Sequence, residues 1–257
     1  MSCRRGEVTE SGFKDHFSRQ AAEYARFRPR YPKELFRYLA IVAPSPELAW
    51  DCATGNGQAA VELAEVFDRV IGTDASEKQI VNAEARDRVE YRVAPAEESE
   101  IESNTVDLIA VAQALHWFDL EQFYKEVRRV LKPKGVIAAW AYKLAHITPS
   151  IDAVVTDYYS DVVGAYWPAE RVIVEKFEDL SFPFPEIAAP SFQMVAEWNV
   201  AHLMGYLRTW SATQRFMAAN QRDPLQDVER ELRSAWGGAE QLRRVVWPLT
   251  VRAGRLL

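Results

Sequence analysis

Short apolar runs alternate with amphipathic segments over the middle of the chain, from residue 48 to residue 142. The apolar runs predict strands over residues 48–51, 70–74, 88–93, 105–112 and 136–142. The segments between them repeat apolar residues at helical spacing and predict helices over residues 57–67, 76–85 and 120–131. A regular alternation of strand and helix is typical of a parallel, doubly wound α/β sheet.

The flanking segments are less regular. A helical seam occupies residues 13–27, and Pro32 opens a second helix over residues 32–42. After Tyr142 the pattern predicts helices near residues 151–158 and 172–180, from Asn199 and from Asp223, and strands over residues 192–198 and 245–251. We expect these last two strands to pair antiparallel at the sheet edge, because Pro248 implies an edge or a bulge.

Length and composition fit one large α/β domain, since 257 residues with 48% hydrophobic residues provide an ample core. We interpret residues 1–257 as a single domain in four parts. These are an N-terminal helical flap (13–45), a nucleotide-binding core (46–142), a helical lid insertion (143–190) and C-terminal strands and helices (191–257).

The glycine turn after the first strand carries the candidate chemistry. Gly55 and Gly57 allow a tight turn with close backbone approach to a ligand, and Asp74, which ends the second strand, suits a ribose diol. This spacing also fits the looser dinucleotide fingerprint, so an NAD-dependent oxidoreductase stays open. Asp51 favours S-adenosylmethionine (SAM), because an acid at this turn attracts an ammonium group and repels a pyrophosphate. Alternatively, Asp51 only caps the turn.

Charge and cysteine content exclude several classes of partner. The net charge of −6 disfavours nucleic acid as a substrate. Cys3 and Cys52 form neither a metal-binding spacing nor a disulfide framework. The first residues lack an apolar signal core, and no run reaches the length of a membrane span. We therefore expect a soluble cytoplasmic protein without metal, nucleic-acid or membrane partners, as a monomer or a homodimer.

Three motifs add a family resemblance: Tyr24 with residues 28–32, residues 113–119, and residues 206–211. Together they resemble the class I SAM-dependent methyltransferases (methyltransferase type 11), and most closely the small-molecule branch around trans-aconitate methyltransferase. The resemblance covers residues 13–142, and residues 190–251 more loosely. It implies a Rossmann-like, doubly wound sheet of seven strands, mostly parallel with the last strand antiparallel, plus a helical lid insertion.

The resemblance also implies the cofactor site. The side chains and backbone that would bind SAM, or the product S-adenosylhomocysteine, are Tyr24, Asp51, Ala53, Gly55, Gly57, Asp74, Ala75, Ala96, Glu97 and Gln113. One position departs from the family pattern. Pro95 stands where the class often has an Asp that binds the adenine amine, so Glu97 or a backbone carbonyl takes that role.

The expected reaction is an in-line transfer of the methyl group to a small acceptor, in which a carboxylate needs no base and a hydroxyl or amine needs one. His116 is the candidate base, or a residue that only frames the pocket, and Tyr142 would orient the substrate. Candidate substrate-binding residues are Arg28, Tyr31, Trp117 and Arg208. Residues 113–116 replace the motif of amino-methylating nucleic-acid enzymes, and no Pro-Cys pair supplies a pyrimidine nucleophile. A non-catalytic SAM-binding protein remains a further alternative.

Overall fold

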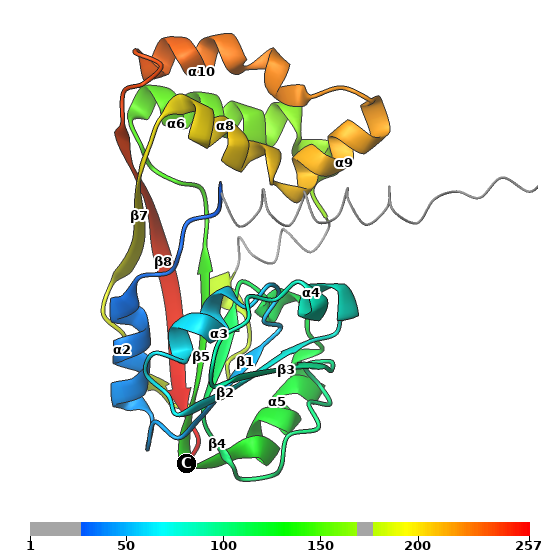
Figure 1. Ribbon diagram of the computed structural model, residues 1–257, viewed down its shortest axis with the longest axis vertical. Helices are drawn as coiled ribbons and strands as arrows, with labels where there is room; N and C mark the ends of the chain where they lie inside the picture. Colours follow the sequence, from blue (N-terminus) through cyan, green and yellow to red (C-terminus); the bar gives the residue numbers. More distant parts are fainter. Residues whose placement is uncertain (1–26, 169–176) are drawn as a thin grey trace, which may run out of the picture.

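A computed structural model describes residues 27–168 and 177–257 of the chain. The predicted helix over residues 13–27, apart from its last residue, and most of that over residues 172–180 lie outside the described residues, as does Tyr24. The described part consists of one twisted sheet with helices against it and a layer of helices beyond one of its ends (Figure 1).

The strand–helix alternation predicted over residues 48–142 is confirmed. The elements are α2 (Lys33–Val42), β1 (Leu48–Cys52), α3 (Gln58–Leu63), β2 (Arg69–Asp74), α4 (Glu77–Val81), β3 (Val89–Val93), β4 (Val106–Ala112), α5 (Leu120–Val130) and β5 (Leu131–Tyr142). These strands pair parallel in the order β3-β2-β1-β4-β5. The order reverses between β1 and β4, which is where a doubly wound sheet opens a ligand crevice.

Alternate residues of the strands feed two separate apolar cores. Ala49 and Val136 point to the core that contains α2 and α3, whereas their neighbours Trp50 and Ile137 point to the core that contains α5. A strand that is apolar on both sides is expected in a sheet covered on both faces. The near-continuous hydrophobicity of the central strands therefore follows directly from double winding.

The sheet has eight strands, so the predicted number of seven is wrong. β8 (Arg243–Arg255) pairs antiparallel with β5, as expected for the last strand. Two short strands, β6 (Glu186–Ile187) and β7 (Phe192–Trp198), both pair antiparallel with β8 and share its other edge. The break between them contains Pro190, which cannot donate to a ladder. One edge position is thus divided into two strands.

Pro248 lies just outside the part of β8 that pairs with β5. The β5 pairing ends with Tyr142 opposite Leu249, and beyond it only an isolated bridge joins His146 to Val246. Because Pro248 has no N–H to donate, this gap accommodates it without the loss of a ladder hydrogen bond. Pro248 therefore occupies an edge only locally, on the side of β8 that faces β5.

Helices after β5 form a cap beyond the end at which β5 finishes (Figure 1). The cap helices are α6 (Pro149–Asp157), α8 (Val200–Arg208), α9 (Ser211–Asn220) and α10 (Glu229–Trp236), joined by short helices at Tyr158–Val162, Gly164–Tyr166 and Pro224–Asp227. Asn199 caps α8 by accepting a hydrogen bond from the His202 N–H at 2.9 Å, as predicted. No helix within the described ranges is both long and apolar enough to cross a membrane.

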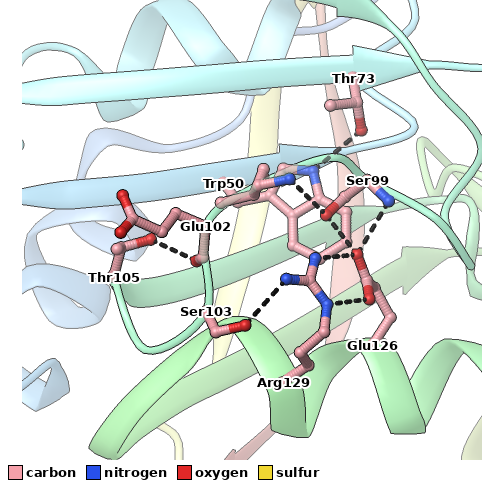
Figure 2. A network of polar contacts seen from close by, with 9 residues as sticks. Trp50, Thr73, Ser99, Glu102, Ser103, Thr105, Glu126 and Arg129 are labelled. Carbon is pink, nitrogen blue, oxygen red and sulfur yellow. Dashed lines mark hydrogen bonds and ion pairs between the residues drawn. The ribbon is translucent and has the colours of Figure 1, made fainter.

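A buried polar network fixes the loop between β3 and β4 (Figure 2). Glu126 of α5 accepts hydrogen bonds from the backbone N–H and the hydroxyl of Ser99, at 2.8 and 2.5 Å. It also accepts one from Nε and one from Nη2 of Arg129, each at 2.7 Å. Burial raises the pKa of Glu126, but the hydrogen bonds from Arg129 and Ser99 outweigh it and hold that pKa below its usual value. The loop that carries Ala96 and Glu97 is thus anchored to α5.

Candidate active site

A cleft of about 1210 Å³ separates the carboxyl ends of the parallel strands from the cap. The sheet side contributes residues after each of the five parallel strands, β1 to β5, and the cap contributes Trp167 and residues 206 and 209–211. The cleft brings together most of the predicted site positions, namely Arg28, Tyr31, Ala53, Gly55, Asp74, Ala75, Ala96, Glu97, Gln113, His116, Trp117 and Tyr142. Asp51, Gly57 and Arg208 are not among the residues that line it.

The two glycines of the turn have different structural roles. Gly55 has φ +58°, and a Cβ built on it would meet nothing within 4 Å, so its backbone faces open space in the cleft. Gly57 has φ +85° and is buried, and a Cβ there would collide with the hydroxyl of Tyr91 on β3. Gly55 therefore allows a ligand to approach, whereas Gly57 allows the turn to pack on the sheet.

Asp74 presents a fixed carboxylate to the cleft. Its Oδ2 accepts a hydrogen bond from the Gly55 N–H at 3.0 Å, and its Oδ1 accepts one from the Ser76 N–H at 2.9 Å. Each oxygen has a further lone pair, so the group can still accept from a vicinal diol.

Asp51 lies beneath the glycine turn and is completely buried. Its Oδ2 accepts a hydrogen bond from the Thr54 hydroxyl at 2.5 Å, while no residue of the described part hydrogen-bonds its Oδ1. Burial raises the pKa of Asp51 to about 7; the Thr54 hydrogen bond works against this shift and the charge of Asp74 adds to it. An incompletely paired acid here is compatible with a cationic ligand above the turn, and also with the turn-capping alternative.

Gln113, directly after β4, has a constrained conformation. Its φ of +57° is unusual for a residue with a side chain, and Ala53 after β1 shares this feature with φ +54°. The Gln113 Nε2 donates to the Tyr142 carbonyl at 3.1 Å, which assigns the amide oxygen as the remaining acceptor. Left-handed residues at the ends of adjacent strands are typical of ligand sites.

Arg28 joins the cap to the sheet across one end of the cleft. Its Nε donates to the Thr209 hydroxyl at 3.1 Å, its Nη2 to the Thr209 carbonyl at 3.3 Å, and its Nη1 to the Tyr142 hydroxyl at 3.3 Å. Its Cζ lies 5.2 Å from the centroid of the Tyr206 ring. The adjacent Pro29 carbonyl accepts a hydrogen bond from the Gln58 side chain at 2.7 Å. The segment over residues 27–32 is thus held on both sides of the cleft.

Arg208 has a different position. Its Nε lies 2.8 Å from Asp223 Oδ2 in an ion pair within the cap. Its neighbour Thr209 contacts Arg28 and lines the cleft, whereas the sequence had predicted Arg208 as a substrate-binding residue. The sequence does not show which of these two adjacent positions lines the cleft, because that depends on which face at the end of α8 is turned toward it.

His116 and Trp117 lie on a short helix, Leu115–Trp117, at the mouth of the cleft. Their ring centroids are 4.8 Å apart, and the Trp117 side chain is 55% exposed. Glu97, from the loop after β3, accepts a hydrogen bond from the Asp119 N–H at 2.9 Å. This bond ties the predicted adenine side of the cleft to the start of α5.

Charge is divided along the cleft. The carboxylates that line it within the described ranges, Asp74, Glu84 and Glu97, all come from the β2, α4 and β3 region. Lys78 of α4 also lines this end, which is net negative because the three carboxylates outnumber it. Arg28 and Lys143 lie at the other end, beside Tyr142. The fold and site so far define a nucleotide-binding α/β protein with an acidic end and a basic end to its cleft. In the part of the chain described, no group of three or more His, Cys, Asp or Glu side chains is placed to hold a metal ion.

Comparison with known proteins identifies the class. Residues 50–139 match the family model described as a methyltransferase domain. A Dictyostelium discoideum protein that carries a methyltransferase name is 36% identical over 233 residues, which cover 89% of each chain. A Saccharomyces cerevisiae protein named as a SAM-dependent methyltransferase is 29% identical over 132 residues, 48% of this chain and 45% of that one. This chain therefore matches less than half of the yeast protein.

The fold has a close structural counterpart as well. A solved structure from Anaeromyxobacter dehalogenans, which bears the name of a type II methyltransferase, has a TM-score of 0.84 and 46% identity. It covers 90% of this chain and 99% of its own. The chain belongs to the class I SAM-dependent methyltransferases, and its cofactor is SAM. The alternative of an NAD-dependent oxidoreductase is therefore set aside, whereas membership of the trans-aconitate branch stays a prediction.

Proposed function

We propose that this enzyme transfers the methyl group of SAM to a small-molecule acceptor that carries a carboxylate. The observation that carries this proposal is the division of charge in the cleft, with Asp74 at one end and Arg28 at the other. An anionic acceptor is attracted to the basic end and repelled from the acidic end, so the charges orient it.

The cofactor end consists of the residues after β1, β2, β3 and β4. Asp74 would accept hydrogen bonds from the ribose hydroxyls, and the open space at Gly55 would admit the amino acid moiety, with Asp51 beneath it. Gly57 contributes by shaping the turn. The remaining backbone and side-chain contacts would come from Ala53, Ala75, Ala96, Glu97 and Gln113. When bound, SAM supplies a methyl group that its sulfonium has already activated.

The acceptor end would hold the carboxylate beside the hydrogen-bonded pair of Arg28 and Tyr142, with Tyr31 and Trp117 as further contacts. In the transfer, a carboxylate oxygen forms a bond to the methyl carbon while the sulfur–carbon bond breaks and its electron pair stays on sulfur. The two charges cancel, giving a methyl ester and a neutral thioether, and no proton moves. The protein contributes chiefly orientation, which supplies up to about 7–11 kcal/mol in favourable intramolecular systems.

His116 has a conditional role in this proposal. If the acceptor is a carboxylate, no base is needed and His116 only frames the mouth of the cleft. If the acceptor is a hydroxyl or an amine, His116 would act as the general base. We further propose that the chain is a single domain in which the described parts of the 13–45 flap and the 143–190 insertion, which contribute Arg28, Tyr31 and Trp167 to the cleft, contact the acceptor. A net charge of −6 supports a small acceptor over nucleic acid.

The first experiment titrates the protein by calorimetry with S-adenosylhomocysteine and, separately, with NAD. We expect micromolar binding of S-adenosylhomocysteine alone, lost in Asp74→Ala and kept in Asp68→Ala, which removes an exposed acid outside the cleft. A screen of small carboxylic acids with SAM then tests the acceptor class, with methyl ester formation followed by mass spectrometry. Binding of NAD alone would overturn the proposal, and cofactor binding without turnover of any acceptor would favour a non-catalytic protein.

A further inference from the structure

The acceptor end of the cleft is lined by an aromatic wall, which we define as Tyr31, Tyr142, Trp167, Tyr206 and Trp210. These residues come from distant parts of the chain. Tyr31 belongs to the 27–32 segment, and Tyr142 ends β5. Trp167 follows the helix Gly164–Tyr166, Tyr206 lies in α8, and Trp210 follows α8. Their convergence on one end of one cleft is a property of the tertiary structure.

The wall is continuous. Ring centroids are 6.5 Å apart between Tyr31 and Tyr142, 5.8 Å between Tyr206 and Trp210, and 5.6 Å between Trp167 and Trp210. Arg28 joins these two groups of rings, because it hydrogen-bonds the Tyr142 hydroxyl and stacks on Tyr206. Tyr142 and Trp167 are half-buried, whereas Tyr31, Tyr206 and Trp210 are buried.

This lining limits the charge that an acceptor can carry. Among the described residues at this end of the cleft, the cationic side chains are Arg28 and Lys143. With one carboxylate at Arg28, a second has the exposed Lys143 as its cationic partner among these residues. A carboxylate beyond these would have to lie against ring faces, which carry negative partial charge, and an unpaired buried carboxylate is costly. A flat apolar group instead gains both from burial and from ring contacts.

We propose that the acceptor is a monocarboxylic acid with a flat, apolar or aromatic body, and that the aromatic wall selects this body over additional carboxylates. This inference rests on the proposed carboxylate methyltransferase function and specifies its substrate class. Trp167 is the specificity-determining residue that the geometry singles out, because its ring is partly exposed and its indole N–H is already satisfied by the Tyr159 carbonyl at 3.1 Å.

The test compares three acids of the form X–CH=CH–COO⁻ in which only X changes. They are trans-cinnamate (phenyl), crotonate (methyl) and fumarate (carboxylate), with cinnamyl alcohol as a neutral aromatic acceptor. We expect kcat/KM for cinnamate to exceed that for crotonate about tenfold, as burial of a ring together with ring contacts predicts. Fumarate should be the poorest of the three acids.

Variants make the assignment specific. Trp167→Leu should lower the ratio of kcat/KM for cinnamate to that for crotonate about tenfold, while binding of S-adenosylhomocysteine is retained. Tyr38→Leu is the matched control, because Tyr38 lies on α2 and is not among the cleft-lining residues. Equal ratios in the wild type and Trp167→Leu would remove Trp167 from the proposal.

Failure of this inference and failure of the proposed function give different results. Fumarate preferred over cinnamate would overturn the inference and leave carboxylate methylation intact. If cinnamyl alcohol is methylated and none of the three acids is, the carboxylate proposal is overturned, while the role of the aromatic wall is retained. If no acceptor is methylated, cinnamate is titrated into the complex of the protein with S-adenosylhomocysteine. Absence of cinnamate binding at millimolar concentration would then overturn the inference as well as the proposed function.

Discussion

Arg28 donates a hydrogen bond from Nη1 to the hydroxyl oxygen of Tyr142 at 3.3 Å. A guanidinium group has no acceptor atom, so the Tyr142 oxygen must be the acceptor, and its own proton is left to donate elsewhere. Both side chains line the cleft. The pair therefore offers an oriented hydroxyl donor next to a fixed positive charge, at the end of the cleft where we place the carboxylate.

Substitution of Arg28 tests this arrangement. Arg28→Gln should raise KM for an acidic acceptor about tenfold or more, because a charge-assisted hydrogen bond contributes about 1.5–3 kcal/mol. Tyr142→Phe should produce a smaller increase. Steady-state kinetics with a saturating SAM concentration would measure both.

Arg208→Gln is the informative contrast. Its ion pair with Asp223 is partly exposed, so its loss should cost less than about 1 kcal/mol of stability and leave the acceptor KM close to that of the wild type. Equal KM effects in Arg28→Gln and Arg208→Gln would mean that general charge, and not the position of Arg28, attracts the acceptor.

The two glycines of the turn should fail in different ways when replaced by Ala. Gly55→Ala should cost only about 1 kcal/mol of stability but weaken cofactor binding, because its methyl group would enter the open space of the cleft. Gly57→Ala should destabilise the protein more strongly, since the new Cβ would collide with Tyr91. Thermal unfolding and titration with S-adenosylhomocysteine separate these effects.

A double variant tests the cause at Gly57. Adding Tyr91→Phe to Gly57→Ala removes the hydroxyl that the new Cβ would meet and should restore part of the lost stability. Strictly additive losses in the double variant would show that backbone strain at φ +85°, and not the collision, is responsible.

Asp51 should make the stability of the protein depend on pH. Its pKa rises from 3.8 to about 7 in the folded protein, so the unfolded chain loses this proton first as pH increases. Wild-type stability should therefore fall relative to Asp51→Asn between about pH 4 and pH 7, by at most about 4 kcal/mol, and the difference should level off above that range. Urea unfolding of both proteins across this range would measure it, and a difference that is constant with pH would contradict the assignment.

Glu126 should show the opposite dependence. Hydrogen bonds from Arg129 and Ser99 hold its pKa below the usual value despite burial (Figure 2). Its contribution is present above the pKa of the unfolded chain and is lost as pH falls through the folded pKa. Glu126→Gln should cost about 1–3 kcal/mol at pH 7, and less at low pH.

The network also has a functional consequence that can be measured. Glu126 anchors Ser99, two residues after Glu97 in the loop that lines the cleft. Glu126→Gln should therefore weaken binding of S-adenosylhomocysteine at a temperature where the variant is still folded. Lys125→Gln is the matched control, because Lys125 is exposed on the same helix. Unchanged affinity in Glu126→Gln would restrict the network to a role in stability.

Local signals in the sequence predicted the local structure well. The helices predicted to start at residue 76, at residue 120 and from Asn199 are each present. They are capped by the side chains of Ser76, Asp119 and Asn199, which accept a hydrogen bond from an N–H three residues later. Helix lengths were less accurate, because α3 and α4 end at Leu63 and Val81, before the predicted residues 67 and 85. Phe67, at the end of the predicted range, is nevertheless buried.

The sequence by itself determined the alternation of strands and helices, the glycine turn and the acids at the carboxyl ends of β1 and β2. These features depend on neighbours within a few residues, so periodicity and residue type suffice to predict them. Only the tertiary structure decided that Gly57 packs on Tyr91, that Thr209 and not Arg208 meets Arg28, and that one sheet edge is shared by two strands. Arg28 and Thr209 are 181 residues apart, and their contact depends on the position of the cap relative to the sheet. That position results from many weak packing interactions, which no local sequence pattern encodes.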